Sequence, residues 1–338
     1  MAWRSGARLI SALLLLVVSA GSFTLWAWRD WTTPGPLPEK RIIVLPRGSG
    51  AVDVARTLGA EGVLAHPSIF LLDAAVTGDV HRLKAGEYEF EAAITPEGVA
   101  DLLASGKTVR HRLTIPEGLT SAEIVAIVNA TPELEGNPEP VPTEGSLMPE
   151  TYFFALGDKR SAMVERMERA FSRAVAELWT ERGADLPFAK PEDAVILASI
   201  VEKETGRDEE RPHVAGVYVN RMRLGMRLQA DPTVIYAITH GKAPLDRPLG
   251  HDDLGIDSPY NTYAVKGLPP TPIANPGLAA LKAVLHPLKM DDLYFVADGT
   301  GKHVFAKTLA EQNQHINDLR RAQSQAAAPA NPQAAPAR

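Results

Sequence analysis

The chain has 338 residues, of which 45% are hydrophobic and 22% are charged, values that are ordinary for a globular protein with room for two domains. Its net charge of −6 argues against nucleic acid as the main ligand. The absence of cysteine excludes disulfides, a lipoprotein anchor and thiolate catalysis, and it suits an oxidising compartment.

The N-terminal segment is long and apolar enough to cross a membrane. Residues Leu9–Trp28 carry no charge and have about the length that a helix needs to span a bilayer core. Arg4 and Arg8 precede the segment with no acidic residue between them, which favours a cytoplasmic location for residues 1–8. The alternative is a cleaved signal peptide with a small-residue site at Val18-Ser19-Ala20. We favour the anchor because cleavage would leave an apolar tail; in both cases the remainder is exported.

A linker and a small domain are expected to follow the membrane segment. The linker covers residues 29–40, and its Pro-rich part, Thr32–Lys40, is expected to be too stiff and polar to pack. Residues 41–115 alternate between strand and helix patterns, which predicts a compact α+β module. The predicted strands are Arg41–Leu45, Gly86–Phe90 and Thr108–Ile115, and the predicted helices are Ala51–Leu58, Pro67–Val76 and Thr95–Ala104. Nothing in this module resembles an active site, so spacing or carbohydrate binding is its expected role.

A second domain, residues 116–321, is predicted to be mainly helical with one β-hairpin, so the fold class is α+β. Thr120 and Glu123 fit a capping box at the start of its first helix. Leu293–Ala297 and His303–Ala306 flank a Gly-containing turn, which predicts the hairpin. Residues 322–338 form an Ala/Pro-rich tail that is expected to be disordered.

The stretch Ala194–Gly206 is the most informative part of the chain, because an uncharged run leads directly to Glu202, Lys203 and Glu204. Proline and two acids before the run, and glycine after it, predict the start and end of one buried helix. We expect apolar neighbours and the negative end of the helix dipole to keep the Glu202 carboxyl protonated near neutral pH. A carboxyl in that state can serve as a general acid. The alternative is a solvated last turn without a chemical role.

Other polar segments have a structural explanation beside a functional one. Asp231 precedes Pro232 and fits a helix N-cap, so a catalytic role needs more evidence. The segment Asp257–Pro270 is rich in Asn, Thr and Tyr, which dock on sugar hydroxyls, but its composition also fits a surface turn. The loop Glu144–Tyr152, which contains Glu150, fits the wall of a site or a plain connector.

No metal and no cofactor is expected. The nine histidines are scattered and none falls in a tight ligand spacing such as HExxH. The sequence contains no P-loop, dinucleotide-binding glycine pattern or GxSxG elbow, and Ser199 lies within the predicted buried helix, a poor position for a nucleophile. With these classes of site excluded, the remaining possibility is catalysis by a carboxylate on a substrate outside the cell membrane.

Several blocks of sequence together resemble those of the YceG-like, or MltG-type, endolytic murein transglycosylases. The blocks occur in the same order and at similar spacing, and the resemblance extends from the membrane segment to about Leu319. They are Ala198–Thr205 (ASIVEKET), Gly225–Tyr236 (GMRLQADPTVIY), Ser258–Pro270 (SPYNTYAVKGLPP), Asn275-Pro276-Gly277 and Leu293–Gly299 (LYFVADG), with Ile115–Thr120 and Glu144–Tyr152 as two further blocks. Long ordered blocks are more specific than a single short motif.

The resemblance implies an inner-membrane anchor, a LysM-like module at residues 41–115 and a periplasmic catalytic domain. It also implies lytic cleavage of peptidoglycan between N-acetylmuramic acid and N-acetylglucosamine within nascent glycan strands, with peptidoglycan synthases as further partners. Glu202 matches the catalytic glutamate of the family by its place in ASIVEKET. The residues expected at the substrate are Gln229, Asp231, Asn261, Thr262, Tyr263 and Glu150.

Lytic cleavage needs a single carboxyl group. Protonated Glu202 would give its proton to the glycosidic oxygen and then accept one from the C6 hydroxyl of the same sugar, which closes a 1,6-anhydro ring. Hydrolysis is the nearest alternative and needs a second carboxylate, from Asp231, Asp257, Glu150 or Glu204. Glu204 is the least favoured, because a two-residue offset on a helix directs it away from Glu202. A non-catalytic scaffold that binds the cell wall and recruits synthases is a further alternative.

Overall fold

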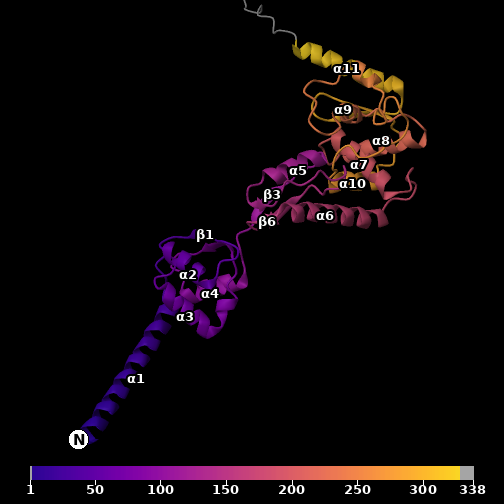
Figure 1. Cartoon of the computed structure of the whole chain (residues 1–338). Helices are drawn as coiled ribbons and strands as arrows, with labels where there is room; N and C mark the ends of the chain where they lie inside the picture. The colour runs from indigo at the N-terminus through magenta and orange to yellow at the C-terminus, as the bar shows by residue number, and fades with distance from the viewer. Residues whose placement is uncertain (1, 328–338) are drawn as a thin grey trace, which may run out of the picture. The chain divides into compact units, whose positions relative to one another are not determined.

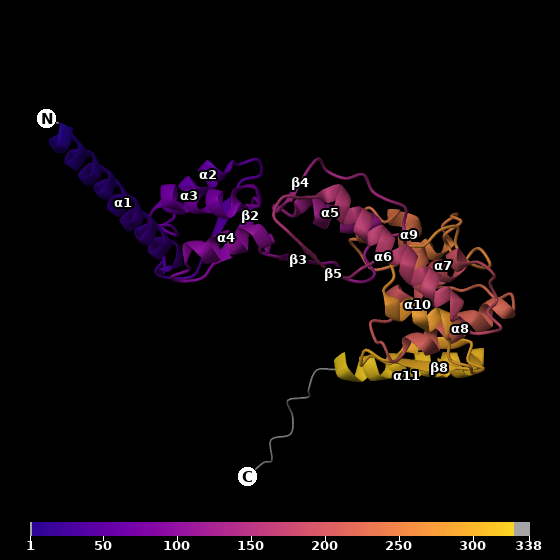
Figure 2. The same ribbon diagram turned by 90° about the horizontal axis from the view of Figure 1, so that it is seen from below.

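The computed structural model describes residues 2–327, with side chains described for residues 10–321 and 323. It is a mixed α/β structure in which helices predominate and the strands are short (Figures 1 and 2). The chain divides into two compact units. The N-terminal unit comprises the residues up to Arg112 together with Phe153–Gly157, and the C-terminal unit comprises the rest.

The first helix, α1 (Ala2–Thr32), contains the predicted membrane segment and continues beyond Trp28. Residues Ile10–Thr32 are long and apolar enough to cross a membrane, as expected. The end of α1 packs on the N-terminal unit, where the Trp31 ring stacks on Phe70 with 5.9 Å between centroids. Asp30 Oδ1 lies 2.8 Å from His66 Nδ1. The last turns of α1 are therefore part of this unit.

The Pro-rich spacer packs against the N-terminal unit, so the expectation that Thr32–Lys40 would not pack is wrong. Leu37 is only 2% exposed and belongs to the hydrophobic core of the unit. The backbone N–H of Gly35 donates to the Ile94 carbonyl oxygen at 3.1 Å. A Cβ atom on Gly35 would lie 2.5 Å from that oxygen, so glycine allows the close approach of the two backbones.

Two antiparallel strands and three α-helices make up the rest of the N-terminal unit. Strand β1 (Arg41–Leu45) pairs with β2 (Gly86–Phe90), with Ile43 opposite Tyr88. The helices are α2 (Ala51–Ala60), α3 (Pro67–Thr77) and α4 (Pro96–Ser105), with a short 3₁₀ helix, η1 (Asp79–His81). The Thr95 hydroxyl caps α4 by accepting the Gly98 N–H at 3.0 Å, as its place before Pro96 predicts. The unit has the expected α+β composition, but the third predicted strand, Thr108–Ile115, appears as β3 (His111–Thr114) and pairs with β5 (Thr151–Phe154) instead of joining β1 and β2.

Short strand pairs and eight helices form the described part of the C-terminal unit and its border. Strand β3 (His111–Thr114) pairs with β5 (Thr151–Phe154), β4 (Leu134–Glu135) pairs in parallel with β6 (Asp158–Lys159), and β7 (Tyr294–Ala297) pairs with β8 (His303–Ala306). The helices are α5 (Ser121–Ala130), α6 (Arg160–Thr180), α7 (Pro191–Glu204), α8 (Arg211–Arg223), α9 (Asp231–Thr239), η2 (Asp252–Gly255), α10 (Leu278–Leu285) and α11 (Leu309–Ala327). The predicted β7–β8 hairpin and the Thr120–Glu123 capping box are confirmed.

Helix α7 is the centre of the C-terminal unit. It contacts α6, α8, α9 and α10 (Figure 2). Every residue from Ala194 to Glu202 is buried, which confirms the predicted buried helix. The helix ends at Glu204 because Thr205 adopts an extended backbone conformation. The end of α7 is therefore where the core of the unit meets its surface.

Two details of the chain differ from expectation. Helix α9 begins at Asp231 and Ala230 occupies the N-cap position, so the predicted N-cap role of Asp231 is wrong. Its carboxylate accepts a hydrogen bond from Tyr263 instead. Helix α11 extends to Ala327, within the tail that was expected to be disordered, and residues 328–338 of that tail lie outside the described residues.

Candidate active site

The last turn of α7 carries two glutamates whose side chains have separate partners. Glu202 is the last of the buried residues of the helix, whereas Glu204 is only half-buried. The two-residue offset directs them to different sides of the helix, as expected. Each glutamate therefore has its own local chemistry.

Both oxygens of Glu202 are occupied by charged or backbone donors. The Arg211 guanidinium donates to Oε1 at 2.8 Å, and the Gly277 N–H donates to Oε2 at 2.9 Å. The side chain of Glu202 is 4% exposed and that of Arg211 is 5% exposed. The carboxyl is buried at the end of an apolar run, as expected, but it is also held in an ion pair with Arg211 and a backbone hydrogen bond from Gly277, which the expectation did not include.

Glu117 joins the same ion-pair network from the Ile115–Thr120 block. Arg211 Nη2 lies 3.4 Å from Glu117 Oε2, and Nη1 of the same guanidinium contacts Asp208. Partial burial raises the pKa of Glu117, the charge of Glu202 raises it further, and Arg211 opposes both effects. Sequence reasoning missed Glu117 and Arg211 at this position, although Glu117 lies in one of the blocks that carry the family resemblance.

Asn275 holds three distant blocks together next to Glu202. Its side-chain oxygen accepts the Leu147 N–H at 2.8 Å, and its amide group donates to the Ser121 hydroxyl and to Glu144, each at 3.1 Å. The side chain is fully buried. This arrangement fixes Gly277, two residues later, where its N–H reaches Glu202. The role of the Asn275-Pro276-Gly277 block is therefore to shape the core around the Glu202 ion pair.

Glu204 has the proton chemistry that was expected of Glu202. Its carboxylate accepts a short hydrogen bond from the Tyr218 hydroxyl at 2.6 Å. Burial raises the pKa of Glu204 to about 7; the hydrogen bond from Tyr218 opposes this shift, the charge of Asp231 adds to it and Arg221 opposes it. A carboxyl with a pKa near 7 can both give and take a proton at neutral pH.

Three of the residues predicted to bind substrate, Asp231, Tyr263 and Gln229, are linked to Glu204 through Asp231 and Arg221. Asp231 is exposed, and its Oδ1 accepts the Tyr263 hydroxyl at 2.6 Å. Gln229 is exposed, and its side-chain oxygen accepts a hydrogen bond from Arg221 at 3.3 Å. The charges of Asp231 and Arg221 both act on the pKa of Glu204, which places the three side chains in one electrostatic group.

Arg221 is the buried, positively charged residue of this group. Its guanidinium donates to the carbonyl oxygens of Leu293 at 2.6 Å and Leu228 at 2.7 Å. It also lies 5.0 Å from the centroid of the Tyr294 ring, in a cation–π contact. Sequence reasoning missed Arg221 and the role of Tyr218, because neither the helix pattern nor a short motif marks them.

Asn261 and Thr262 are fully buried, so their expected contact with substrate does not agree with the structure. The Asn261 amide group donates to the Leu254 and Ile256 carbonyl oxygens at 3.0 and 2.9 Å. The Thr262 hydroxyl accepts the Ala230 N–H at 2.9 Å, just before Asp231. Both side chains thus hold the loop and the helix start that present Tyr263 and Asp231.

Glu150 is exposed and directly precedes β5. Its carbonyl oxygen accepts the Ile115 N–H at 3.0 Å. The charge of Glu150 acts on Tyr152, and Glu150 is not among the described groups that shift the pKa of Glu204.

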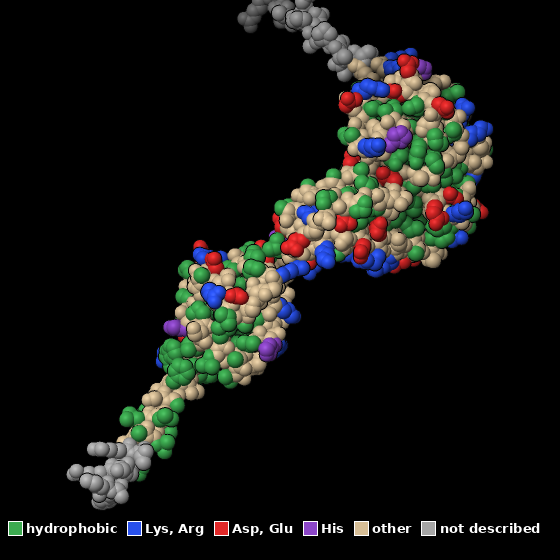
Figure 3. Space-filling model, viewed as in Figure 1, with side chains coloured by type: hydrophobic (Ala, Val, Ile, Leu, Met, Phe, Trp, Pro, Cys, Tyr) green, Lys and Arg blue, Asp and Glu red, His purple; other side chains and the backbone are tan. Residues whose placement is uncertain are grey.

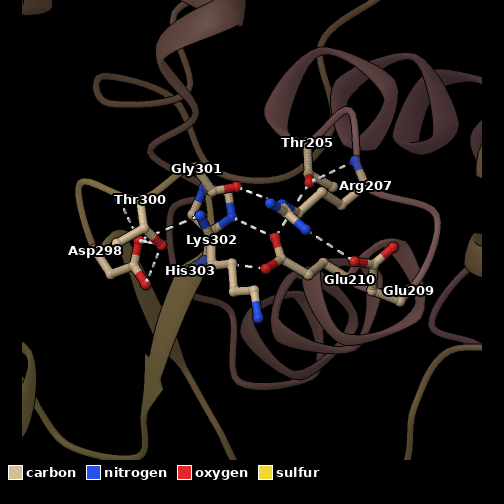
Figure 4. Close-up of polar contacts among 9 residues, drawn as sticks. All are labelled: Thr205, Arg207, Glu209, Glu210, Asp298, Thr300, Gly301, Lys302 and His303. Carbon is tan, nitrogen blue, oxygen red and sulfur yellow. Dashed lines mark hydrogen bonds and ion pairs between the residues drawn. The ribbon is translucent and has the colours of Figure 1, made fainter.

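Hydrogen bonds and an ion pair connect the loop that follows Glu204 to the β7–β8 hairpin. Figure 4 shows His303 and Gly301 of the hairpin facing Glu210 and Arg207 of the loop. Glu210 Oε2 lies 2.7 Å from His303 Nδ1, and Arg207 Nε donates to the Gly301 carbonyl oxygen at 2.6 Å. Burial alone would raise the pKa of Glu210, but the hydrogen bonds from His303 lower it. These contacts fix the backbone directly after Glu204.

A large apolar cavity lies elsewhere along α7. It has a volume of about 690 Å³, and Phe171, Trp179, Val195 and Pro270 are among the residues that line it. Its lining includes neither Glu202 nor Glu204. Within the described residues no group of three or more His, Cys, Asp or Glu side chains could hold a metal ion.

The sequence model of the YceG-like family matches residues 43–318. The chain belongs to this family. Among its YceG-like relatives is an endolytic murein transglycosylase of Bacillus subtilis, which is 31% identical over 80% of this chain and 82% of the relative. An endolytic murein transglycosylase of Streptococcus pneumoniae is 28% identical over 92% of this chain and 64% of the relative. A crystal structure of a yceG-like protein from Listeria monocytogenes matches with a TM-score of 0.52 and 32% identity, over 82% of this chain and 99% of that one.

Proposed function

We propose that this protein is an endolytic murein transglycosylase. It cleaves the bond between N-acetylmuramic acid and N-acetylglucosamine within nascent peptidoglycan strands, leaves 1,6-anhydro ends and so terminates strand elongation. Its membership of the YceG-like family and the names of its relatives support this reaction. The long apolar α1 supports a single-pass anchor in the cell inner membrane, with the N-terminus cytoplasmic and the catalytic unit periplasmic.

Glu204, rather than Glu202, is the general acid in this proposal. The observation that carries it is the pair of environments two residues apart on α7. Glu202 has both oxygens bound in a buried ion pair, whereas Glu204 is half-buried, has a pKa of about 7 and lies with exposed Asp231 and Gln229. A general acid must reach its substrate and carry a proton at the working pH, and the partial exposure and raised pKa of Glu204 support both conditions.

The proposed reaction needs no water. Protonated Glu204 donates to the glycosidic oxygen while the bond from that oxygen to C1 of the muramic acid breaks. The C6 hydroxyl oxygen of the same sugar then bonds to C1, and its proton returns to Glu204. The product is a 1,6-anhydro ring and a free hydroxyl on the departing sugar, so protons and bonds balance and the acid is regenerated.

Asp231, Gln229 and Tyr263 support the reaction in separate ways. The charge of Asp231 keeps the pKa of Glu204 high and stabilises the positive charge that develops at C1. The Tyr263 hydroxyl orients Asp231. The exposed Gln229 amide is available for sugar hydroxyls while Arg221 holds its oxygen. These roles extend the substrate-binding assignment that the sequence blocks predict.

Matched substitutions at the two glutamates test the assignment. Glu204→Gln should lower cleavage of purified glycan strands on the order of 10²–10⁴-fold without loss of fold, because proton transfer is worth about that much. Glu202→Gln should instead lower the unfolding temperature, because buried Arg211 then loses its one buried carboxylate partner and keeps only the more exposed Glu117 and Asp208. Mass spectrometry of anhydro products measures cleavage, and circular dichroism follows unfolding. A folded Glu202→Gln protein that is inactive beside an active Glu204→Gln protein would reverse the assignment.

Hydrolysis is the second candidate, because Asp231 supplies a carboxylate near Glu204. Hydrolysis adds water, so the product would be a reducing end that carries ¹⁸O from labelled solvent. We expect anhydro ends without solvent ¹⁸O. Reducing ends with incorporated ¹⁸O would establish the hydrolase and exclude the lytic reaction.

The N-terminal module supports catalysis from outside the active site in this proposal. Its order of two strands and three helices is compatible with a LysM-like module that binds or spaces the glycan strand, and peptidoglycan synthases are proposed partners. A protein that lacks residues 41–110 should still cleave soluble strands, because Glu204 and its neighbours lie in the C-terminal unit. Loss of cleavage by that protein, with the C-terminal unit folded, would assign the module a direct part in the reaction.

A further inference from the structure

Helix α3 is apolar around its whole circumference, yet part of it faces outward. Phe70 and Ala74 are buried in the core, but Leu72 is 44% exposed and Val76 is 80% exposed. Asp73 is its only charged residue. A helix without a polar face is normally covered on all sides. The outer face of α3 therefore lacks the polar side chains that a water-exposed helix carries.

This face adjoins the helix that is expected to cross the membrane. Helices α1 and α3 are in contact, and both lie in the N-terminal unit. Phe23 and Trp28 of α1 are also largely exposed. We call Phe23, Trp28, Leu72 and Val76 the interfacial patch. Figure 3 shows hydrophobic side chains gathered where α1 joins the module. The patch thus continues the apolar surface of α1 onto the folded unit.

A cavity of about 460 Å³ opens between α1, α3 and the start of α4. All four residues of the interfacial patch line it, and its charged lining residues are Asp73 and Glu97, both acidic. Oδ2 of Asp73 is buried and, among the described residues, has no hydrogen-bond partner. Burial, together with the charge of Asp30, raises the pKa of Asp73. An unpartnered carboxyl oxygen in an acidic, apolar cavity is suited to an amphiphile with a cationic head.

We propose that this cavity binds the headgroup of a phospholipid that carries a primary ammonium group, with an acyl chain along the interfacial patch. The ammonium donates to Asp73 Oδ2 and lies near Glu97, which satisfies the unpartnered oxygen and reduces the negative charge of the cavity by one unit. A quaternary ammonium has no N–H to donate, so the site distinguishes ethanolamine from choline headgroups. Anionic headgroups are disfavoured by both acids. The inference rests on the proposed membrane anchor.

Competition among lipids tests the headgroup assignment. The full-length protein is equilibrated in detergent with equal amounts of phosphatidylethanolamine, phosphatidylcholine and phosphatidylglycerol, and native mass spectrometry counts the bound lipids. We expect phosphatidylethanolamine to be retained about tenfold over phosphatidylcholine, the range of one charge-assisted hydrogen bond. Asp73→Asn should abolish this preference, whereas Asp101→Asn, an exposed acid on α4 outside the cavity lining, should keep it. Equal retention of the lipids, or an unchanged preference in Asp73→Asn, would overturn the proposal.

A site-specific label tests whether the patch is in the membrane. Because the chain has no cysteine, Val76→Cys introduces a single thiol for a nitroxide label. The label should be accessible to oxygen and shielded from a water-soluble nickel complex in vesicles. Val44→Cys on β1, an exposed valine of the same unit, should show the reverse. If the label at Val76 is exposed to water in protein that stays on carbonate-washed vesicles, the lipid-binding proposal is wrong and the proposed anchor stands. If the carbonate wash releases the protein, the proposed anchor is wrong.

Discussion

Two glutamates on one helix turn differ because of residues that lie far away in the sequence. Arg211 neutralises Glu202 from the next helix, and Gly277 donates to it from a loop 75 positions later. Glu204 meets Tyr218 and the charge of Asp231 instead. The choice of the reactive carboxyl therefore depends on tertiary contacts and not on the apolar run that precedes both residues.

The raised pKa of Glu204 makes a prediction for the stability of the protein. The folded state holds a proton on Glu204 up to about pH 7, whereas an unfolded glutamate releases it near 4.5. Stability should therefore fall as pH rises from about 4.5 to 7 and stay lowered above. Glu204→Gln removes this loss of stability. The free energy of unfolding of the variant should therefore exceed that of the wild type by roughly 1–3 kcal/mol at pH 8 and by little at pH 4.5. Urea unfolding at both pH values measures the difference. Glu165→Gln on the exposed face of α6 is the control, and an equal gain there would contradict the assignment.

The same proton makes a prediction for the rate. Because the acid form of Glu204 starts the reaction, kcat/KM should decline above about pH 7, approaching tenfold for each further pH unit. Asp231→Asn removes a nearby negative charge that helps to keep the pKa high, so the decline should begin at lower pH in that variant. Initial rates on soluble glycan strands between pH 5 and 9 provide the measurement. If the pH dependence of kcat/KM is the same in Asp231→Asn as in the wild type, Asp231 does not help to set the pKa of Glu204.

The sequence predicted the composition of the site better than the role of each residue. Tyr263 donates to Asp231, the charge of Asp231 acts on Glu204, and Gln229 accepts from Arg221, so the three residues share one network. They were expected beside Glu202, and their contact with substrate stays a prediction. Asn261 and Thr262 belong to the same blocks but are fully buried and hold the backbone. A motif records which residues a fold needs without distinguishing a side chain that meets the substrate from one that supports the loop beneath it.

At the scale of elements, local patterns predicted most helices and the hairpin. Cap residues such as Thr95 and Thr120 act through neighbours within four positions, so their signal is local. The spacer was predicted less well because Leu37 is one apolar residue among prolines, and its burial depends on a core formed mainly by residues 43–103. Partners that are distant in sequence decide whether such a segment packs.

The contacts between Glu210 and His303 of the β7–β8 hairpin predict that Glu210 affects activity without touching the substrate. Its two carboxylate oxygens hold the backbone N–H and the ring of His303, so Glu210→Gln should loosen the segment after Glu204. We expect kcat to fall roughly tenfold with little change in KM, since a small misplacement of the acid affects the chemical step. Steady-state kinetics measure this split. Arg169→Ala, which breaks an exposed ion pair on α6, should leave both constants unchanged. A Glu210→Gln variant that changes only KM would contradict the positioning role.

At the scale of the whole molecule, the two units have separate hydrophobic cores. One core contains Phe90 and Leu37 of the N-terminal unit, the other contains Leu197 and Ile200 of α7, and the two clusters have no residue in common. Folding cooperativity arises from shared packing, so each core should unfold as its own unit. Scanning calorimetry of the full-length protein in detergent should resolve two transitions.

Substitutions in each core assign the two transitions. Phe90→Ala removes a fully buried ring, which typically costs about 3–5 kcal/mol, so it should lower one transition by roughly 10 °C or more and leave the other in place. Ile200→Ala, also fully buried, should lower the other transition alone. The Phe90→Ala protein should keep its cleavage of soluble strands at temperatures where its N-terminal unit is unfolded, because Glu204 and its neighbours belong to the C-terminal unit. If both substitutions shift a single common transition, the cores are energetically coupled, and the N-terminal unit then contributes to the stability of the active site.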